Sequence, residues 1–148
     1  MELGPPDKED LPRLVELLGF LFTGEAEFAA DARKQRAALE LILSDSRVGR
    51  IFVAREARKV VAMASLLYTV STAEGGRAAL FEDLVVAPEA RGAGVGAALL
   101  QYVIEQARKE GLLRITLLTD RDNQPAQALY RKLGFVDSPM KPMRLKLG

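Results

Sequence analysis

Residues 84–99 read LVVAPEARGAGVGAAL. An apolar run ends at Pro88, an arginine follows at position 91, and glycines occupy positions 92, 94 and 96. Glycine weakens both helices and strands. Three glycines between a strand and a helix therefore indicate that the chain needs main-chain groups without side chains at this point. The unpaired N–H groups and the positive dipole at the start of a helix bind anions. The stretch therefore predicts a site for a phosphate or pyrophosphate.

Two kinds of site fit this loop, and the first is the dinucleotide-binding fingerprint. Residues 92–97, GAGVGA, satisfy the pattern G-x-G-x-x-G/A. Asp120 ends the next expected strand, but it lies farther on than the ~20 residues usual for the ribose-binding acid. The loop also begins at residue 91 of 148, which leaves too little chain to complete a doubly wound sheet. The dinucleotide interpretation is therefore disfavoured.

The second interpretation takes Arg91 into the motif, as R-G-A-G-V-G. In that form the loop resembles the acetyl-CoA pyrophosphate loop of the GNAT family of N-acetyltransferases. FEDLVVAPEARGAGVGAALL, residues 81–100, is similar to the family's central strand, loop and long helix. NQPAQALYRKLGF, residues 123–135, is similar to its second signature. Two motifs in the expected order are far more specific than either one alone.

Hydrophobic periodicity predicts a mixed α/β (α+β) arrangement in one domain, residues 1–148. Helical spacing of apolar residues predicts helices over 11–22, 27–43, about 94–110 and 123–133. Runs rich in β-branched residues, or alternating with polar ones, predict strands at 50–54, 60–70, 78–87, 112–119 and 143–147. The resemblance implies a GNAT fold: a mixed central sheet of six to seven strands flanked by about four helices, with a bulged, splayed central strand.

The composition excludes several kinds of chemistry. The chain has no cysteine and no histidine, which rules out a thiolate nucleophile, an imidazole base and a Cys/His metal site. The net charge of +1 gives no reason to expect nucleic acid or a membrane surface as partner. The first residues lack the pattern of a signal peptide, so we expect a soluble, cytoplasmic protein that uses no metal.

The resemblance implies how acetyl-CoA would be held. The backbone of the central strand would bind the pantetheine arm, the loop would bind the pyrophosphate, and the second motif would line the far wall. These positions are Leu84, Val85 and Val86 for the strand, Arg91, Gly92, Ala93, Gly94, Val95, Gly96 and Ala97 for the loop, and Asn123 and Ala126 for the wall.

Three further residues are candidates for the reaction. Tyr130 matches the family's tyrosine that protonates the departing thiolate, and a phenol suits this step because its pKa lies near that of a thiol. The alternative is a core tyrosine. Glu82 matches a carboxylate that serves as general base in the diamine acetyltransferases, and Asp83 is an orienting or substrate-binding candidate. Strand alternation is expected to send the two carboxylates to opposite faces; the alternative for Glu82 is a plain salt bridge.

The acceptor is less well defined. By resemblance, the segment between the first two helices contributes to its pocket, which makes Phe22, Glu25 and Phe28 candidates for substrate contact. Acidic residues at this site favour a small cationic amine, polyamine-like or amino-acid-like, acetylated directly because no cysteine can carry the acyl group. A protein lysine or N-terminus as acceptor, a non-catalytic acetyl-CoA sensor, and a homodimer remain open alternatives.

Overall fold

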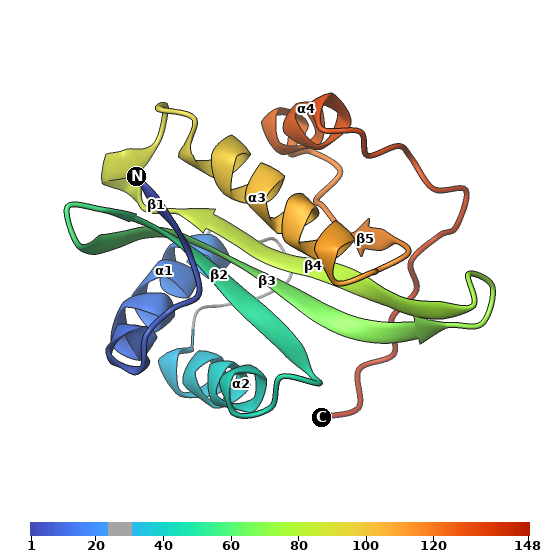
Figure 1. Cartoon of the computed structure of the whole chain (residues 1–148), viewed down its shortest axis with the longest axis horizontal. Coiled ribbons are helices and arrows are strands. Elements are labelled where there is room, and N and C mark those ends of the chain that lie inside the picture. Colours follow the sequence, from blue (N-terminus) through green and yellow to red (C-terminus); the bar gives the residue numbers. More distant parts are fainter. Residues whose placement is uncertain (24–30) are drawn as a thin grey trace.

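Two β-hairpins and one crossover build most of a single five-stranded sheet with the strands in chain order, β1 to β5 (Figure 1). The computed structural model describes residues 1–23 and 31–148. The three pairs from β1 to β4 are antiparallel, and β5 runs parallel to β4. The elements are β1 (Glu2–Gly4), α1 (Leu11–Thr23), α2 (Ala32–Ser44), β2 (Gly49–Glu56), β3 (Lys59–Ser71), β4 (Gly76–Val86), α3 (Val95–Lys109), β5 (Ile115–Leu117) and α4 (Gln124–Lys132).

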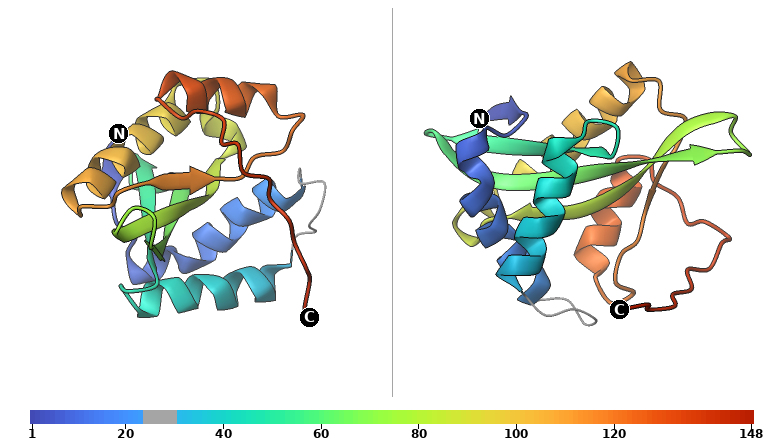
Figure 2. Two further views of the ribbon diagram at one scale, coloured as in Figure 1. Left: turned by 90° about the vertical axis from the view of Figure 1, so that its right-hand side faces the viewer. Right: turned by 90° about the horizontal axis from the view of Figure 1, so that it is seen from below.

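The helices cover the two faces of the sheet separately, as the side view in Figure 2 shows. On one face, apolar residues of α1 and α2 such as Leu14, Leu17 and Leu39 pack against Val53 and Met63 of the sheet. On the other face, α3 packs through residues that include Leu99 and Val103, and α4 adds partly buried side chains. The sheet therefore lies between two distinct apolar clusters, and it carries α1–α2 on one side and α3–α4 on the other.

The central strand β4 is bulged. Its pairing with β3 shifts between the partners Met63↔Val85 and Ser65↔Glu82, so that β4 carries one extra residue there. Asp83 lies at the bulge with a φ of 54°, which is unusual for a residue other than glycine. The expected bulge in the central strand is confirmed.

The same strand diverges from its other neighbour. β4 pairs with β5 only from Ala79 to Phe81, opposite Ile115–Leu117. Past Phe81 the carboxyl half of β4 has no partner on that side among the described residues. The splayed edge that the resemblance implied is thus present. It leaves main-chain N–H and C=O groups open next to the glycine loop.

The strand count differs from the expectation. The described residues form five strands rather than six or seven, and the predicted strand at 143–147 is an extended tail without ladder pairing. Met143, Leu145 and Leu147 in this tail are 91%, 83% and 90% exposed. An alternating pattern forms a strand only when it pairs with an edge strand and buries its apolar side chains, and this tail has no ladder pairing and leaves these three side chains exposed. The short strand β1 was not predicted, and the helix expected from residue 27 begins at Ala32, with 24–30 outside the described residues.

Candidate active site

A cleft of about 1170 Å³ opens where β4 and β5 diverge. It lies at the carboxyl ends of these parallel strands, where ligands of open α/β sheets bind. Three parts of the chain that the sequence singled out meet in this cleft: the bulged strand, the glycine loop and the second motif. The predicted residues that line it are Phe22, Glu82, Asp83, Leu84, Val85, Val86, Arg91, Gly92, Gly96, Asn123, Ala126 and Tyr130.

The glycine loop places the start of α3 at this cleft. Gly92 and Gly94 have φ values of 85° and 80°, and an added Cβ at either position would meet nothing within 4 Å. Their backbone conformation, rather than lack of space, is therefore what calls for glycine. Gly94 is the N-cap of α3, and no side chain caps this end of the helix. The first N–H groups of α3 are left available for an anion.

Gly96 is a glycine for a different reason. A Cβ at this position would lie 3.3 Å from Cγ2 of Val86, so the first turn of α3 packs closely against the end of β4. Ala93, Gly94, Val95 and Ala97 do not line the cleft. The Val95 side chain is 2% exposed and belongs to the core. Only the backbone of these four residues is placed to shape the loop, so their predicted part in binding stays a prediction.

Arg91 supplies a fixed positive charge beside the loop. Its Nε donates a hydrogen bond to the main-chain oxygen of Val86 at 3.1 Å. This contact holds the guanidinium at the open end of β4. Its two terminal nitrogens have no hydrogen-bond or ion-pair partner in the described part of the chain. An arginine held in this way binds phosphate oxygens through paired N–H donors.

The two carboxylates lie on the same side of the bulge. Glu82 is exposed and Asp83 is half-buried, and both line the cleft. The expectation that strand alternation separates them is wrong, because the bulge interrupts the alternation at Asp83. Beneath them, the hydroxyl of the buried Ser65 donates to the main-chain oxygen of Glu82 at 3.1 Å.

The second motif forms the opposite wall. Oδ1 of Asn123 accepts a hydrogen bond from the backbone N–H of Ala126 at 3.2 Å, so this side chain caps α4. Tyr130 lies two turns later on the same helix and is half-buried. Its ring packs edge-to-face on Phe135, with centroids 5.9 Å apart. The capped helix thus holds the phenol at the cleft.

Sequence reasoning missed several lining residues. Phe20 and Leu21 from α1, residues 117–121 at the end of β5 and just beyond it, and Pro142, Met143 and Arg144 from the tail also border the cleft. Residues 117–121 line the cleft because β5 pairs with β4, and no sequence motif marked this segment. The contribution of the tail had no signal in the sequence. Glu25 and Phe28, both predicted to contact the substrate, lie outside the described residues.

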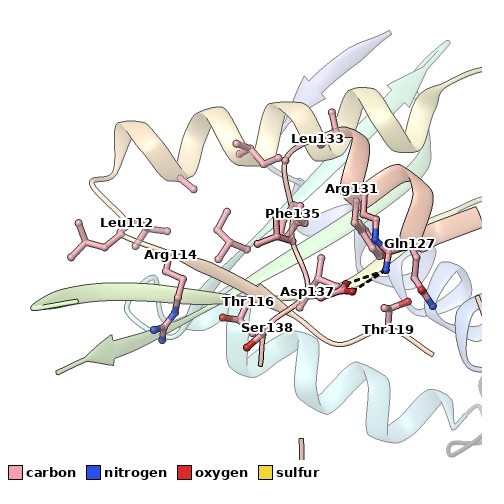
Figure 3. A pocket seen from close by; sticks show the side chains of 18 of the residues that line it. Leu112, Arg114, Thr116, Thr119, Gln127, Arg131, Leu133, Phe135, Asp137 and Ser138 are labelled. Carbon is pink, nitrogen blue, oxygen red and sulfur yellow. Dashed lines mark hydrogen bonds and ion pairs between the residues drawn. The ribbon is translucent and has the colours of Figure 1, made fainter. Parts of the chain in front are cut away.

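A second hollow of about 640 Å³ lies beside β5 (Figure 3). It is bordered by the end of α3, by α4 and by residues 133–139. Nη2 of Arg131 and Oδ1 of Asp137 form an ion pair at its edge, 3.0 Å apart. Of the residues with a predicted role, only Tyr130 lines it. The predicted catalytic residues Glu82 and Tyr130 both line the first cleft.

Neither a metal cluster nor a membrane span is found in the parts that the structure describes. Residues 1–23 and 31–148 contain no group of three or more acidic, histidine or cysteine side chains placed to hold a metal ion. None of the described helices is long and apolar enough to cross a membrane.

Comparison with known proteins gives a consistent result. The model of the acetyltransferase (GNAT) family matches residues 11–135. Glucosamine 6-phosphate N-acetyltransferase of Trypanosoma brucei brucei is 33% identical over 99% of this chain and 96% of its own length. Mycothiol acetyltransferase of Arthrobacter sp. (strain FB24) is 46% identical, over 45% of this chain and 21% of that protein.

Solved structures agree. An integron cassette protein from the mobile metagenome of Cole Harbour Salt Marsh superposes with a TM-score of 0.85 and 27% identity, covering 99% of this chain and 90% of that one. A possible acetyltransferase from Clostridium difficile 630 gives a TM-score of 0.89 at 21% identity, covering 99% and 97%. The second likeness shows the fold alone.

Proposed function

Because the chain belongs to the GNAT family of acetyltransferases, we propose that it transfers an acetyl group from acetyl-CoA directly to the primary amine of a small cationic molecule. One observation supports this most strongly. The start of α3, the open edge of β4, two carboxylates and a tyrosine all border one cleft. The two relatives described above are named after small molecules, glucosamine 6-phosphate and mycothiol, which is consistent with a small acceptor.

The donor is bound along the open edge of β4. The pyrophosphate accepts hydrogen bonds from the first N–H groups of α3 and from Arg91. The pantetheine arm pairs with main-chain groups of Leu84, Val85 and Val86, in the place that a neighbouring strand leaves free past Phe81. This arrangement directs the thioester towards the bulge. An N–H of the strand there stabilises the oxyanion that forms on the thioester carbonyl.

The acceptor amine attacks the thioester carbon, which forms the C–N bond and then breaks the C–S bond. Glu82 takes the proton that the amine loses, directly or through water. Tyr130 gives its phenolic proton to the departing CoA thiolate and regains one from solvent. The acyl group passes directly from CoA to the amine without an acyl-enzyme, since the chain has no cysteine to carry it.

The proposal is tested by thiol release from acetyl-CoA with a panel of amines, using the wild type, Tyr130→Phe and Tyr102→Phe. Tyr102 is the matched control, because its ring packs on Phe52 with centroids 6.0 Å apart and does not line the cleft. We expect Tyr130→Phe to lower kcat by about 100-fold or more while keeping affinity for CoA. Tyr102→Phe should keep full activity.

Three results would contradict parts of the proposal. Full activity of Tyr130→Phe would remove the general-acid role. Binding of CoA without thiol release for any amine in the panel would contradict transfer to those amines and favour a non-catalytic acetyl-CoA sensor. An acetylated protein trapped by mass spectrometry from acetyl-CoA alone would replace direct transfer by a covalent intermediate.

A further inference from the structure

Ser65 is a buried polar residue in the middle of the sheet. It is 1% exposed and lies on β3, opposite Glu82 at the point where the register of β3 and β4 shifts. A buried hydroxyl without a partner costs free energy, so its hydrogen bonds indicate what it supports. Its Oγ lies 3.1 Å from the main-chain oxygen of Glu82 and 3.5 Å from Oδ2 of Asp83. Both contacts belong to the bulge.

The hydroxyl has one proton and two acceptors. The Glu82 carbonyl is slightly beyond the usual O–H···O hydrogen-bond distance, and the Asp83 carboxylate is at the outer limit. A small rotation or shift exchanges one acceptor for the other. The negative carboxylate is the stronger acceptor when it is ionised. Ser65 is therefore able to tie down the bulge and to support the charge on Asp83.

Asp83 needs such support. Its φ of 54° lies in the left-handed region that residues other than glycine rarely adopt, so the surroundings must hold it there. It is half-buried, and it lines the cleft where the acceptor amine is expected. The other ionisable groups that line this cleft are Glu82, Arg91, Asp120, Arg121, Tyr130 and Arg144.

From these contacts we propose that Ser65 is a positioning residue for Asp83. Its hydroxyl donates either to the Glu82 carbonyl, which ties the bulge to β3, or to the ionised Asp83 carboxylate, which then binds the ammonium form of the acceptor. The inference rests on the proposed transferase function for the identity of the ligand. The contacts between Ser65 and the bulge do not depend on that function.

The chain offers a matched control on the same strand. Ser71 is also buried, at 8% exposure, and its Oγ accepts a hydrogen bond from the backbone N–H of Glu74 at 3.0 Å. It lies at the β3–β4 turn and does not line the cleft. Ser65→Ala and Ser71→Ala remove the same atom from the same strand. A loss of stability alone is therefore expected to affect both variants.

The first measurement is steady-state kinetics against pH with the best amine. We expect Ser65→Ala to raise KM for the amine by about tenfold and to move the acidic limb of kcat/KM to higher pH. The reason is that a donor to the ionised carboxylate has been removed. KM for acetyl-CoA should stay near the wild-type value, and Ser71→Ala should change neither. Equal changes in the two variants, or no change in Ser65→Ala, would overturn the inference.

A second measurement needs no turnover. The pH midpoint of the Asp83 side-chain carboxyl carbon signal in NMR should rise in Ser65→Ala and stay constant in Ser71→Ala. If Ser65→Ala does not fold, Ser65→Cys keeps the size and provides only a weak donor. An unchanged midpoint refutes the role of Ser65. A raised midpoint in a protein that acetylates no amine supports Ser65 and contradicts the transferase proposal instead.

Discussion

Replacing Gly94 with alanine separates the two reasons for which this loop uses glycine. Gly94 has a φ of 80° and open space around an added methyl group, so the cost is conformational. The left-handed conformation costs alanine about 1–2 kcal/mol, and reduced freedom of the unfolded chain returns about 0.5 kcal/mol. The net loss is about 1 kcal/mol, or a fall in Tm of about 3 °C for a chain of this size.

The assay combines urea unfolding with calorimetric titration of CoA. We expect Gly94→Ala to unfold at lower urea and to bind CoA more weakly, because a loop that escapes the strain turns its N–H groups away from the anion. Gly19→Ala, inside α1 and also with open space around the methyl group, is the control. It should gain up to about 1 kcal/mol of stability from helix propensity and keep CoA affinity.

One result refutes the reasoning. If Gly94→Ala is as stable as the wild type and binds CoA equally well, the positive φ is not what the loop requires. Gly96→Ala then gives the complementary test of space. Its methyl group would press on Val86 at 3.3 Å in the wall of the cleft, and it should weaken CoA binding with little loss of stability.

Four further substitutions have defined outcomes. Arg58→Gly should raise stability by about 1 kcal/mol in urea unfolding, because Arg58 has a φ of 69° in the β2–β3 turn. Leu99→Ala, at a fully buried position, should lower it by about 3 kcal/mol or more. Asn123→Ala should cost about 1 kcal/mol through loss of the α4 cap. Burial and the neighbouring Glu110 raise the pKa of Tyr68 from 10.0 to about 12. As pH rises, the phenol of the unfolded chain therefore loses its proton before that of the folded protein. The contribution of Tyr68 to stability is complete below pH 10.0, the unfolded pKa, and is lost as pH rises through the folded pKa of about 12. The urea midpoint should fall across that range, and it should fall less in Tyr68→Phe.

The segment from β4 to α3 was predictable because its signals are local. The apolar run, Pro88 and the three glycines determine where the strand ends and the helix begins. The observed α3, Val95–Lys109, agrees closely with the expected helix. The strands predicted at 50–54 and 60–70 are present as β2 and β3, although the turn residues Ala57 and Arg58 between them adopt positive φ without a glycine.

The geometry of the bulge was not predictable from the residues alone. The resemblance implied a bulge, but nothing in FEDLVV indicates that Asp83 takes the extra position or that Ser65 lies beneath it. Both depend on the register between two strands, which no local pattern of residues specifies. The expected strand at 143–147 was wrong for a related reason. Alternation of apolar and polar residues indicates which side chains share one face of a strand. A strand also needs the free edge of a sheet to pair with, and the sequence does not show where such an edge lies.

The sheet has a consequence for how this protein can change in evolution. The glycine loop and Tyr130 belong to the α3–α4 side, whereas Phe20, Leu21 and Phe22 reach the cleft from the helix on the opposite face. Substitutions in α1 that reshape this end of the cleft pack against a separate apolar cluster, so their effects should add to those of substitutions around the glycine loop rather than compound them. Under the proposed function, acceptor preference is thus open to drift and to directed selection, while the loop proposed to hold the acyl donor stays intact.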